Sequence, residues 1–118
     1  MRQITTFEEA KKLVSNNIEI KETSFRYLLS VDYDDGWHCV YDHEDSRYTD
    51  EYGFYYAPTI GELIEWINNK IPPNMELTIN QVNEDNVWEV YIEQDCSTLA
   101  LFEDKELIDA LVELAINI

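Results

Sequence analysis

Basic residues are scarce in this chain. Its 118 residues contain 25 Asp and Glu against 8 Lys and Arg, which leaves a formal net charge of −17 at pH 7. Beyond Arg26 only Arg47, Lys70 and Lys105 are basic, against 21 acidic residues, so residues 27–118 carry about −18. A field of this sign repels nucleic acid and anionic membranes and attracts basic proteins. We therefore expect a basic protein partner and no direct contact with nucleic acid or membrane.

Cysteines and long apolar runs are also few. Cys39 and Cys96 provide no disulfide framework, and we expect them to be reduced thiols of a cytoplasmic protein. The first residues lack the apolar core of a signal peptide, and no apolar run approaches the ~20 residues of a membrane span. A hydrophobic fraction of 45% still provides for one core. The length predicts a single domain over residues 1–118.

Catalytic motifs are missing as well. The chain has no Gly-rich phosphate loop and no Gly-x-Ser-x-Gly sequence. Acid–base catalysis needs two carboxyl groups in one pocket with separated pKa values. Among 25 acidic residues, neighbours such as Glu62 and Glu65 are expected by chance. We therefore expect a protein that is not an enzyme and has no cofactor.

Two segments contain metal-binding residue types in unsuitable spacing. The run from Asp32 to Gly36 resembles a calcium loop, but its glycine falls at position 5 and position 12 is His43, so the EF-hand pattern fails. His38 and Cys39 are adjacent on a predicted strand and should point to opposite faces. We expect no bound metal, with Cys39 in the core and both histidines at the surface.

Helix signals occur three times. Thr6 with Glu9 and Thr59 with Glu62 have capping-box spacing. Apolar residues at helical spacing follow each box, and Asp104 precedes a third such run. Pro72 and Pro73 stop the middle helix. The predicted helices cover residues 6–16, 60–70 and 105–117.

Alternating apolar residues predict two hairpins. Residues 24–33 and 37–41 flank the turn signal Asp34-Asp35-Gly36. Residues 76–82 and 87–93 flank a second turn, with Trp88, Val90 and Ile92 on one buried side. Residues 97–102 are a possible third strand of that unit, 52–56 a possible short strand, and 42–51 a loop. This order predicts an α+β fold, an antiparallel sheet of hairpins with about three helices packed on it.

Three motifs occur in a fixed order along the chain. They are the opening Thr-x-x-Glu helix, the run Tyr-Ala-Pro-Thr-Ile-Gly-Glu-Leu-Ile-Glu-Trp-Ile from Tyr56, and Trp-Glu-Val-Tyr-Ile from Trp88 followed by Lys-Glu-Leu-Ile-Asp-Ala-Leu-Val-Glu-Leu-Ala from Lys105. In this order they resemble small acidic proteins encoded by phages, prophages and related mobile elements of bacteria. The resemblance implies a bacterial or phage origin and an α+β fold, and it implies no catalytic residue.

The segment from residue 32 to 56 combines carboxylates with aromatic side chains. Tyr and Trp are frequent anchors of interfaces, and a ring of carboxylates steers a basic partner. Asp32 and Asp34 on a strand would lie about 6.7 Å apart, near the phosphate spacing of a nucleic-acid strand. A solvated loop over a core that uses some of these aromatic rings is the competing interpretation. The predicted partner-binding residues are Asp32, Asp34, Asp35, Asp42, Glu44, Asp45, Tyr48, Asp50, Glu51 and Tyr52.

These features favour a non-catalytic acidic protein that docks on a basic, nucleic-acid-handling protein and mimics nucleic acid, in the manner of an anti-defence inhibitor. An immunity protein or antitoxin against a basic toxin would use the same physics, and a neighbouring toxin gene would distinguish it. A metal-dependent or carboxylate enzyme is a third class, which metal analysis of the purified protein would test. An acidic domain without any mimicry is the fourth alternative. The sequence does not determine the oligomeric state.

Overall fold

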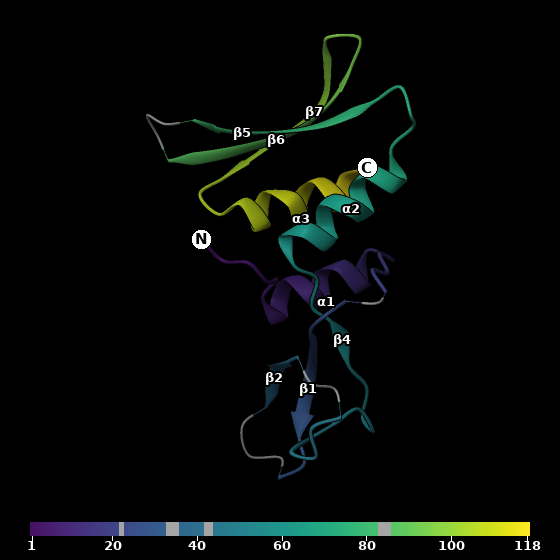
Figure 1. The fold of residues 1–118 in the computed structure, drawn as a ribbon, viewed down its shortest axis with the longest axis vertical. Helices are drawn as coiled ribbons and strands as arrows, with labels where there is room; N and C mark the ends of the chain where they lie inside the picture. Colours follow the sequence, from purple (N-terminus) through teal and green to yellow (C-terminus); the bar gives the residue numbers. More distant parts are fainter. Residues whose placement is uncertain (22, 33–35, 42–43, 83–85) are drawn as a thin grey trace.

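Three helices separate two antiparallel sheets along the long axis of the molecule (Figure 1). The computed structural model describes residues 1–21, 23–32, 36–41, 44–82 and 86–118. Its principal extents are 52 × 32 × 21 Å, and its radius of gyration is 15.9 Å. A compact domain of this length would have a radius of gyration of about 13.5 Å. The molecule is therefore elongated, and the two sheets lie at opposite ends of its long axis.

The first two helices begin as the capping boxes predict. Helix α1 (Phe7–Ser15) follows Thr6, and helix α2 (Ile60–Lys70) follows Thr59. In each box the threonine hydroxyl accepts a hydrogen bond from the backbone N–H three residues on, and the glutamate there accepts one from the threonine N–H. Two of the unpaired N–H groups at each helix start are thereby satisfied. Both predictions are confirmed.

Helix α3 (Leu107–Asn117) begins later than predicted, and Asp104 is not its cap. Asp104 is instead the last residue of strand β7 and pairs with Trp88. Its Oδ1 accepts a hydrogen bond from the backbone N–H of Glu106 at 3.1 Å, which forms a turn between strand and helix. The strand pairing continues two residues past the predicted end at 102, and this delays the helix.

The larger core lies between the helices and a three-stranded sheet. Strands β5 (Glu76–Val82), β6 (Val87–Gln94) and β7 (Ser97–Asp104) pair in that order. Val90 and Ile92 are buried, and Trp88 packs against the same core, so the predicted buried side of this hairpin is confirmed. Helix α3 packs along β6 and β7, and α2 packs on α3. The fully buried side chains of this core include Leu63, Ile67, Val90, Ile108, Leu111 and Leu114.

The strands of the smaller sheet lie between α1 and α2 in the sequence and form one end of the molecule (Figure 1). Strand β1 (Arg26–Ser30) pairs with β2 (Trp37–Val40) on one side and with β3 (Tyr48–Thr49) and β4 (Tyr55–Tyr56) on the other. The first predicted hairpin and the short strand within 52–56 are confirmed. The prediction of a loop over 42–51 is wrong at β3, because Tyr48 and Thr49 pair with Ser30 and Leu29. Residues 42 and 43 lie outside the described part.

The α+β class and the antiparallel pairing are confirmed, with the hairpins divided between two sheets. The number of helices is three, as predicted. The helices cover one face of the three-stranded sheet. Within the part of the chain that the structure describes, no helix combines the length and apolar character needed to cross a membrane.

An aromatic cluster joins the smaller sheet to α1. The ring of Phe7 lies 5.2 Å from that of Trp37 and 5.5 Å from those of Tyr27 and Tyr55. The Tyr27 hydroxyl also donates a hydrogen bond to the Thr5 carbonyl at 2.6 Å. Burial raises the pKa of Tyr27 to about 12, so this donor keeps its proton at neutral pH. The cluster therefore fixes the sheet to the start of α1.

We expect Thr59→Ala to lower the free energy of unfolding by about 1 kcal/mol, because the N–H of Glu62 loses its acceptor at the start of α2. Chemical denaturation of the two proteins measures the difference. Gly61→Ala is the matched control in the same turn. A Cβ at Gly61 would meet no atom closer than 4.0 Å, so this variant should be neutral or slightly more stable. An unchanged stability for Thr59→Ala would contradict the cap.

The hairpin between β6 and β7 turns on an unusual pair of residues. Gln94 pairs with Ser97, so the loop consists of Asp95 and Cys96 alone. Their φ angles are 49° and 65°, in the left-handed region. Such turns normally contain Asn-Gly or Asp-Gly, because a side chain with a Cβ costs roughly 1–2 kcal/mol there. Cys96 therefore strains this turn.

Cys96→Gly should raise the free energy of unfolding by about 0.5–1 kcal/mol. Relief of the left-handed strain exceeds the extra entropy that glycine gives the unfolded chain. Cys96→Ala is the control, because it removes the thiol and keeps the Cβ. Equal stabilities of these two variants in thermal denaturation would show that the turn is not strained.

Candidate functional site

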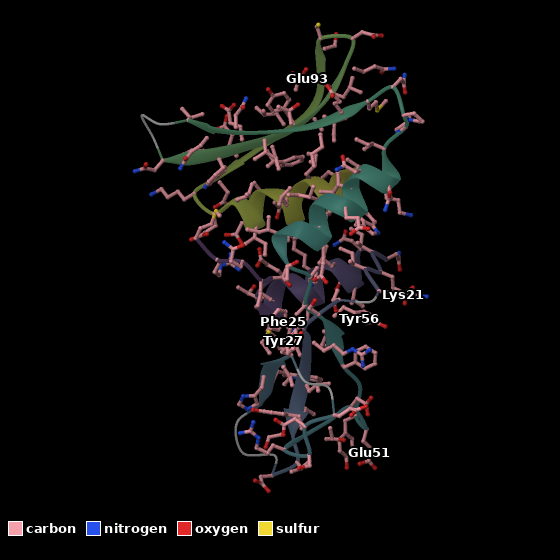
Figure 2. The ribbon with its side chains drawn as sticks, viewed as in Figure 1. Lys21, Phe25, Tyr27, Glu51, Tyr56 and Glu93 are labelled. Carbon is pink, nitrogen blue, oxygen red and sulfur yellow. The ribbon has the colours of Figure 1, made fainter. Side chains whose placement is uncertain are left out.

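The predicted acidic segment surrounds the free end of the smaller sheet. The backbone N–H of Val31 donates a hydrogen bond to the Arg47 carbonyl at 3.0 Å, and the backbone N–H of Gly53 donates one to the Asp50 carbonyl at 2.9 Å. These bonds, with the pairing of β3 on β1, bring the loops after β1, before β3 and after β3 together. Figure 2 shows Glu51 at this end and Glu93 at the opposite end of the molecule.

The predicted partner-binding residues differ in exposure. Asp34, Asp35 and Asp42 lie outside the described residues. Asp45 and Tyr48 are half-buried, and the remaining residues are exposed. Tyr52 has 58% of its surface accessible. The exposed members are Asp32, Glu44, Asp50, Glu51 and Tyr52.

Asp45 is occupied within its own loop. Its carboxylate accepts hydrogen bonds from the backbone N–H of Arg47 at 3.0 Å and from its guanidinium at 2.7 and 3.1 Å. These bonds lower the pKa of Asp45 to about 2. The carboxylate that shapes the loop is thus less available to a partner than those of Asp50 and Glu51.

The aromatic rings of the segment serve two purposes. Trp37 and Tyr55 belong to the cluster on α1, as the competing interpretation of a core role expects. Tyr48 is half-buried, with its ring 5.4 Å from that of His38 and 5.6 Å from the Arg47 guanidinium. Tyr41 and Tyr52 have 71% and 58% of their surfaces exposed. The exposed tyrosines are the rings that remain accessible to a partner.

The phosphate-like spacing predicted for Asp32 is not supported. It requires Asp32 on a strand, and β1 ends at Ser30, so Asp32 lies in the following turn. The second carboxylate of that pair, Asp34, lies outside the described residues. Any mimicry at this end therefore depends on the grouping of loops and not on the rise of one strand.

Cys39 is exposed, which contradicts its predicted place in the core. It lies on β2, an edge strand, opposite Tyr27. Partial burial of its thiol still raises the pKa of Cys39. His43 lies outside the described residues. Across the described ranges, no three His, Cys, Asp or Glu side chains are grouped to hold a metal ion.

The sequence analysis missed a set of ion pairs between α1 and α3. The Arg2 guanidinium donates to Glu9 at 2.7 Å and also to Asp109, and Lys12 pairs with Glu113. Burial opposes ionisation of Glu9, but hydrogen bonds from Asp109, Arg2 and Thr6 outweigh it and lower its pKa. The hydrogen bond to Glu9, together with burial, raises the pKa of Asp109. The two carboxyl groups are engaged with each other and with Arg2.

Charge is distributed unevenly over the three layers. The sequence span 26–56, which contains the strands of the smaller sheet, has eight acidic and two basic residues, a net −6. The span 76–104, which contains the strands of the three-stranded sheet, has eight acidic and no basic residues, a net −8. The remaining nine acidic and six basic residues leave −3 in the rest of the chain. These two spans thus hold most of the charge.

A groove of about 520 Å³ lies between α1 and the chain that leads into α2. Its walls are mostly apolar and include Leu13, Val14, Ile20, Tyr56 and Pro58. Comparison with protein-family models, with curated proteins and with solved structures finds no match for this chain.

The engagement of Asp45 predicts an acid-range titration. The folded-state pKa lies below the ordinary 3.8, so the stabilisation from this pair is complete above pH 3.8 and is lost as the pH falls through about 2. NMR titration of the carboxyl carbon of Asp45 should give a midpoint near 2, and Arg47→Gln should move it towards 3.8. Lys105→Gln, a distant change of the same charge, is the control. A midpoint that is insensitive to Arg47 would contradict the pairing.

Proposed function

We propose that this protein is a non-catalytic acidic binding protein that docks on a basic, nucleic-acid-handling protein and occupies its nucleic-acid-binding surface. It is encoded, on this proposal, by a phage or a related mobile element and acts in the cytoplasm as an inhibitor. The observation that carries the proposal is the distribution of charge, with −6 in the sequence span of the smaller sheet and −8 in that of the three-stranded sheet, two sheets that lie at opposite ends of the molecule.

The linear density of this charge supports mimicry. A net charge of −17 over the 52 Å long axis amounts to about one charge per 3 Å. One strand of DNA carries one phosphate per ~3.4 Å. A basic groove that accepts a nucleic-acid strand therefore meets a comparable total of negative charge over a comparable length, concentrated towards the two ends, and Arg and Lys side chains bind carboxylates as they bind phosphates.

The internal use of the basic residues also supports the proposal. Arg2 and Lys12 pair with acids of the helical layer, and Arg47 pairs with Asp45. The guanidinium of Arg26 stacks on the rings of Phe54 and Tyr56, at 4.6 and 5.4 Å from their centroids. Arg2 and Lys12 therefore neutralise acids of the helical layer, and at the smaller sheet Arg47 pairs with Asp45 and leaves the exposed carboxylates of Asp50 and Glu51.

The test begins with capture from a bacterial lysate at low salt and elution in a salt gradient. Association with the captured protein should weaken steeply with salt. Neutralising three exposed acids of the smaller sheet should slow association roughly tenfold at low salt, because the steering field at that end weakens. Thermal stability should change little, since exposed charges contribute little to folding. The variant combines Asp32→Asn, Asp50→Asn and Glu51→Gln.

The matched control removes three exposed acids from the helical layer, through Glu8→Gln, Glu19→Gln and Glu65→Gln. It has the same net charge as the test variant. If it slows association less than the test variant does, the position of the removed charges matters and not only their number. Duplex DNA should compete with the protein for the captured partner. A partner that binds DNA and this protein together with unchanged affinities would refute mimicry.

A further inference from the structure

The outer face of the three-stranded sheet is an uncovered surface at the end opposite the smaller sheet. All three helices lie on its other side (Figure 1). The register places Tyr91 between Thr78 and Leu101 in one row across the strands. Leu101 has 47% of its surface exposed, and the adjacent Leu99, at a register irregularity, has 53%. No described element of this chain covers these side chains.

Pairs of like charges flank this apolar row on both sides. Glu76 pairs with Glu93, and Glu89 pairs with Glu103. Like charges directly opposite each other on neighbouring strands destabilise a sheet. Within the described ranges no lysine or arginine forms an ion pair with any of the four. The sheet therefore retains four unneutralised carboxylates that its own stability would disfavour.

The central tyrosine is held in place by its neighbours. The amide nitrogen of Asn80 donates to the Tyr91 hydroxyl at 3.0 Å. Rows two residues apart along a strand are ~6.6 Å apart, so the two carboxylate pairs lie about 13 Å from each other with the apolar row between them. Two turns of an α-helix, roughly seven residues, rise about 11 Å. This spacing matches basic residues on one side of a helix with apolar residues between them.

From this arrangement we infer that the outer face of β5–β6–β7 docks a basic amphipathic helix of a partner protein. Its apolar side chains would rest on Tyr91 and Leu101, and its Lys or Arg residues would bind the Glu76–Glu93 and Glu89–Glu103 pairs. A second copy of this chain is disfavoured, because each copy brings −17 and the facing surfaces are both acidic. The surface is separate from the acidic segment of the smaller sheet.

The size of the face predicts the strength of the contact. Three strands ~4.8 Å apart and about seven residues long form a face of roughly 300 Å². Stable interfaces bury about 800 Å² on each partner. The contact is therefore weak, and its affinity falls with added salt.

A synthetic helical peptide of leucine and lysine, with leucines at i, i+3, i+4 and i+7, is the probe. NMR titration of the whole protein should shift the amides of β6 and β7 more than those of β1–β4. A scrambled peptide of the same composition should bind roughly tenfold more weakly. Equal binding of the two peptides would overturn the inference, because it would show attraction by charge alone.

Two variants separate docking from folding. Leu101→Thr places a β-branched residue, which favours strands, at this exposed position and should weaken binding of the amphipathic peptide about tenfold. The double variant Glu89→Gln with Glu103→Gln should weaken it about fivefold and raise the melting temperature, since a like-charge pair is removed. Glu65→Gln, on α2, is the control and should leave peptide binding unchanged. Loss of binding without a gain in stability in the double variant would contradict the arrangement.

The result is independent of the proposed function. The peptide assay needs no captured partner, and the sheet variants leave residues 32–52 unchanged. If the lysate partner fails to compete with DNA but the peptide still maps to β6 and β7, the proposed function fails and this inference holds. The opposite pattern, or a dimer of this chain that depends on Leu101, would overturn the inference alone.

Discussion

The ion pairs of Arg2 with Glu9 and Asp109 are the contact on which the arrangement depends. Helix α1 and helix α3 lie at opposite ends of the sequence, and each presents a carboxylate to Arg2, from Glu9 and from Asp109. The guanidinium of Arg2 lets these two carboxylates approach each other. The backbone N–H of Arg2 also donates a hydrogen bond to the Glu106 carboxylate. The same N-terminal strand pairs Ile4 with Thr59 at the start of α2. The N-terminal segment that contains Arg2 therefore contacts all three helices and holds the helical layer together between the two acidic sheets.

Local signals predicted the fold well. The boxes at Thr6 and Thr59 require only residues three apart, and the alternation around Trp88, Val90 and Ile92 requires only a period of two. Where tertiary pairing competes with a local signal, prediction failed. Asp104 is a good cap by type, but its backbone pairs with Trp88. Cys39 was predicted in the core, but the buried residue of β2 is its neighbour Val40, which points to the other face.

The candidate site was less predictable. Composition indicated an acidic surface but not which carboxylates are free, and only the structure pairs Asp45 with Arg47. Arg2 and Asp109 are 107 residues apart, so the local sequence around either residue does not predict their contact. The opposition of Glu89 to Glu103 depends on the register of β6 and β7. That register depends on the two-residue turn at Asp95 and Cys96, whose residues are not typical of such turns, and on the shift between Ile92 and Glu93 that leaves Leu99 outside the pairing.

Separation of charge onto two ends of a rod has an electrical consequence. At long range the molecule acts as one negative body, because its net charge is −17. At physiological ionic strength the Debye length is about 8 Å, much shorter than the 52 Å long axis. Each end is therefore screened from the other, and the potential at one end is set by the acidic residues of that end.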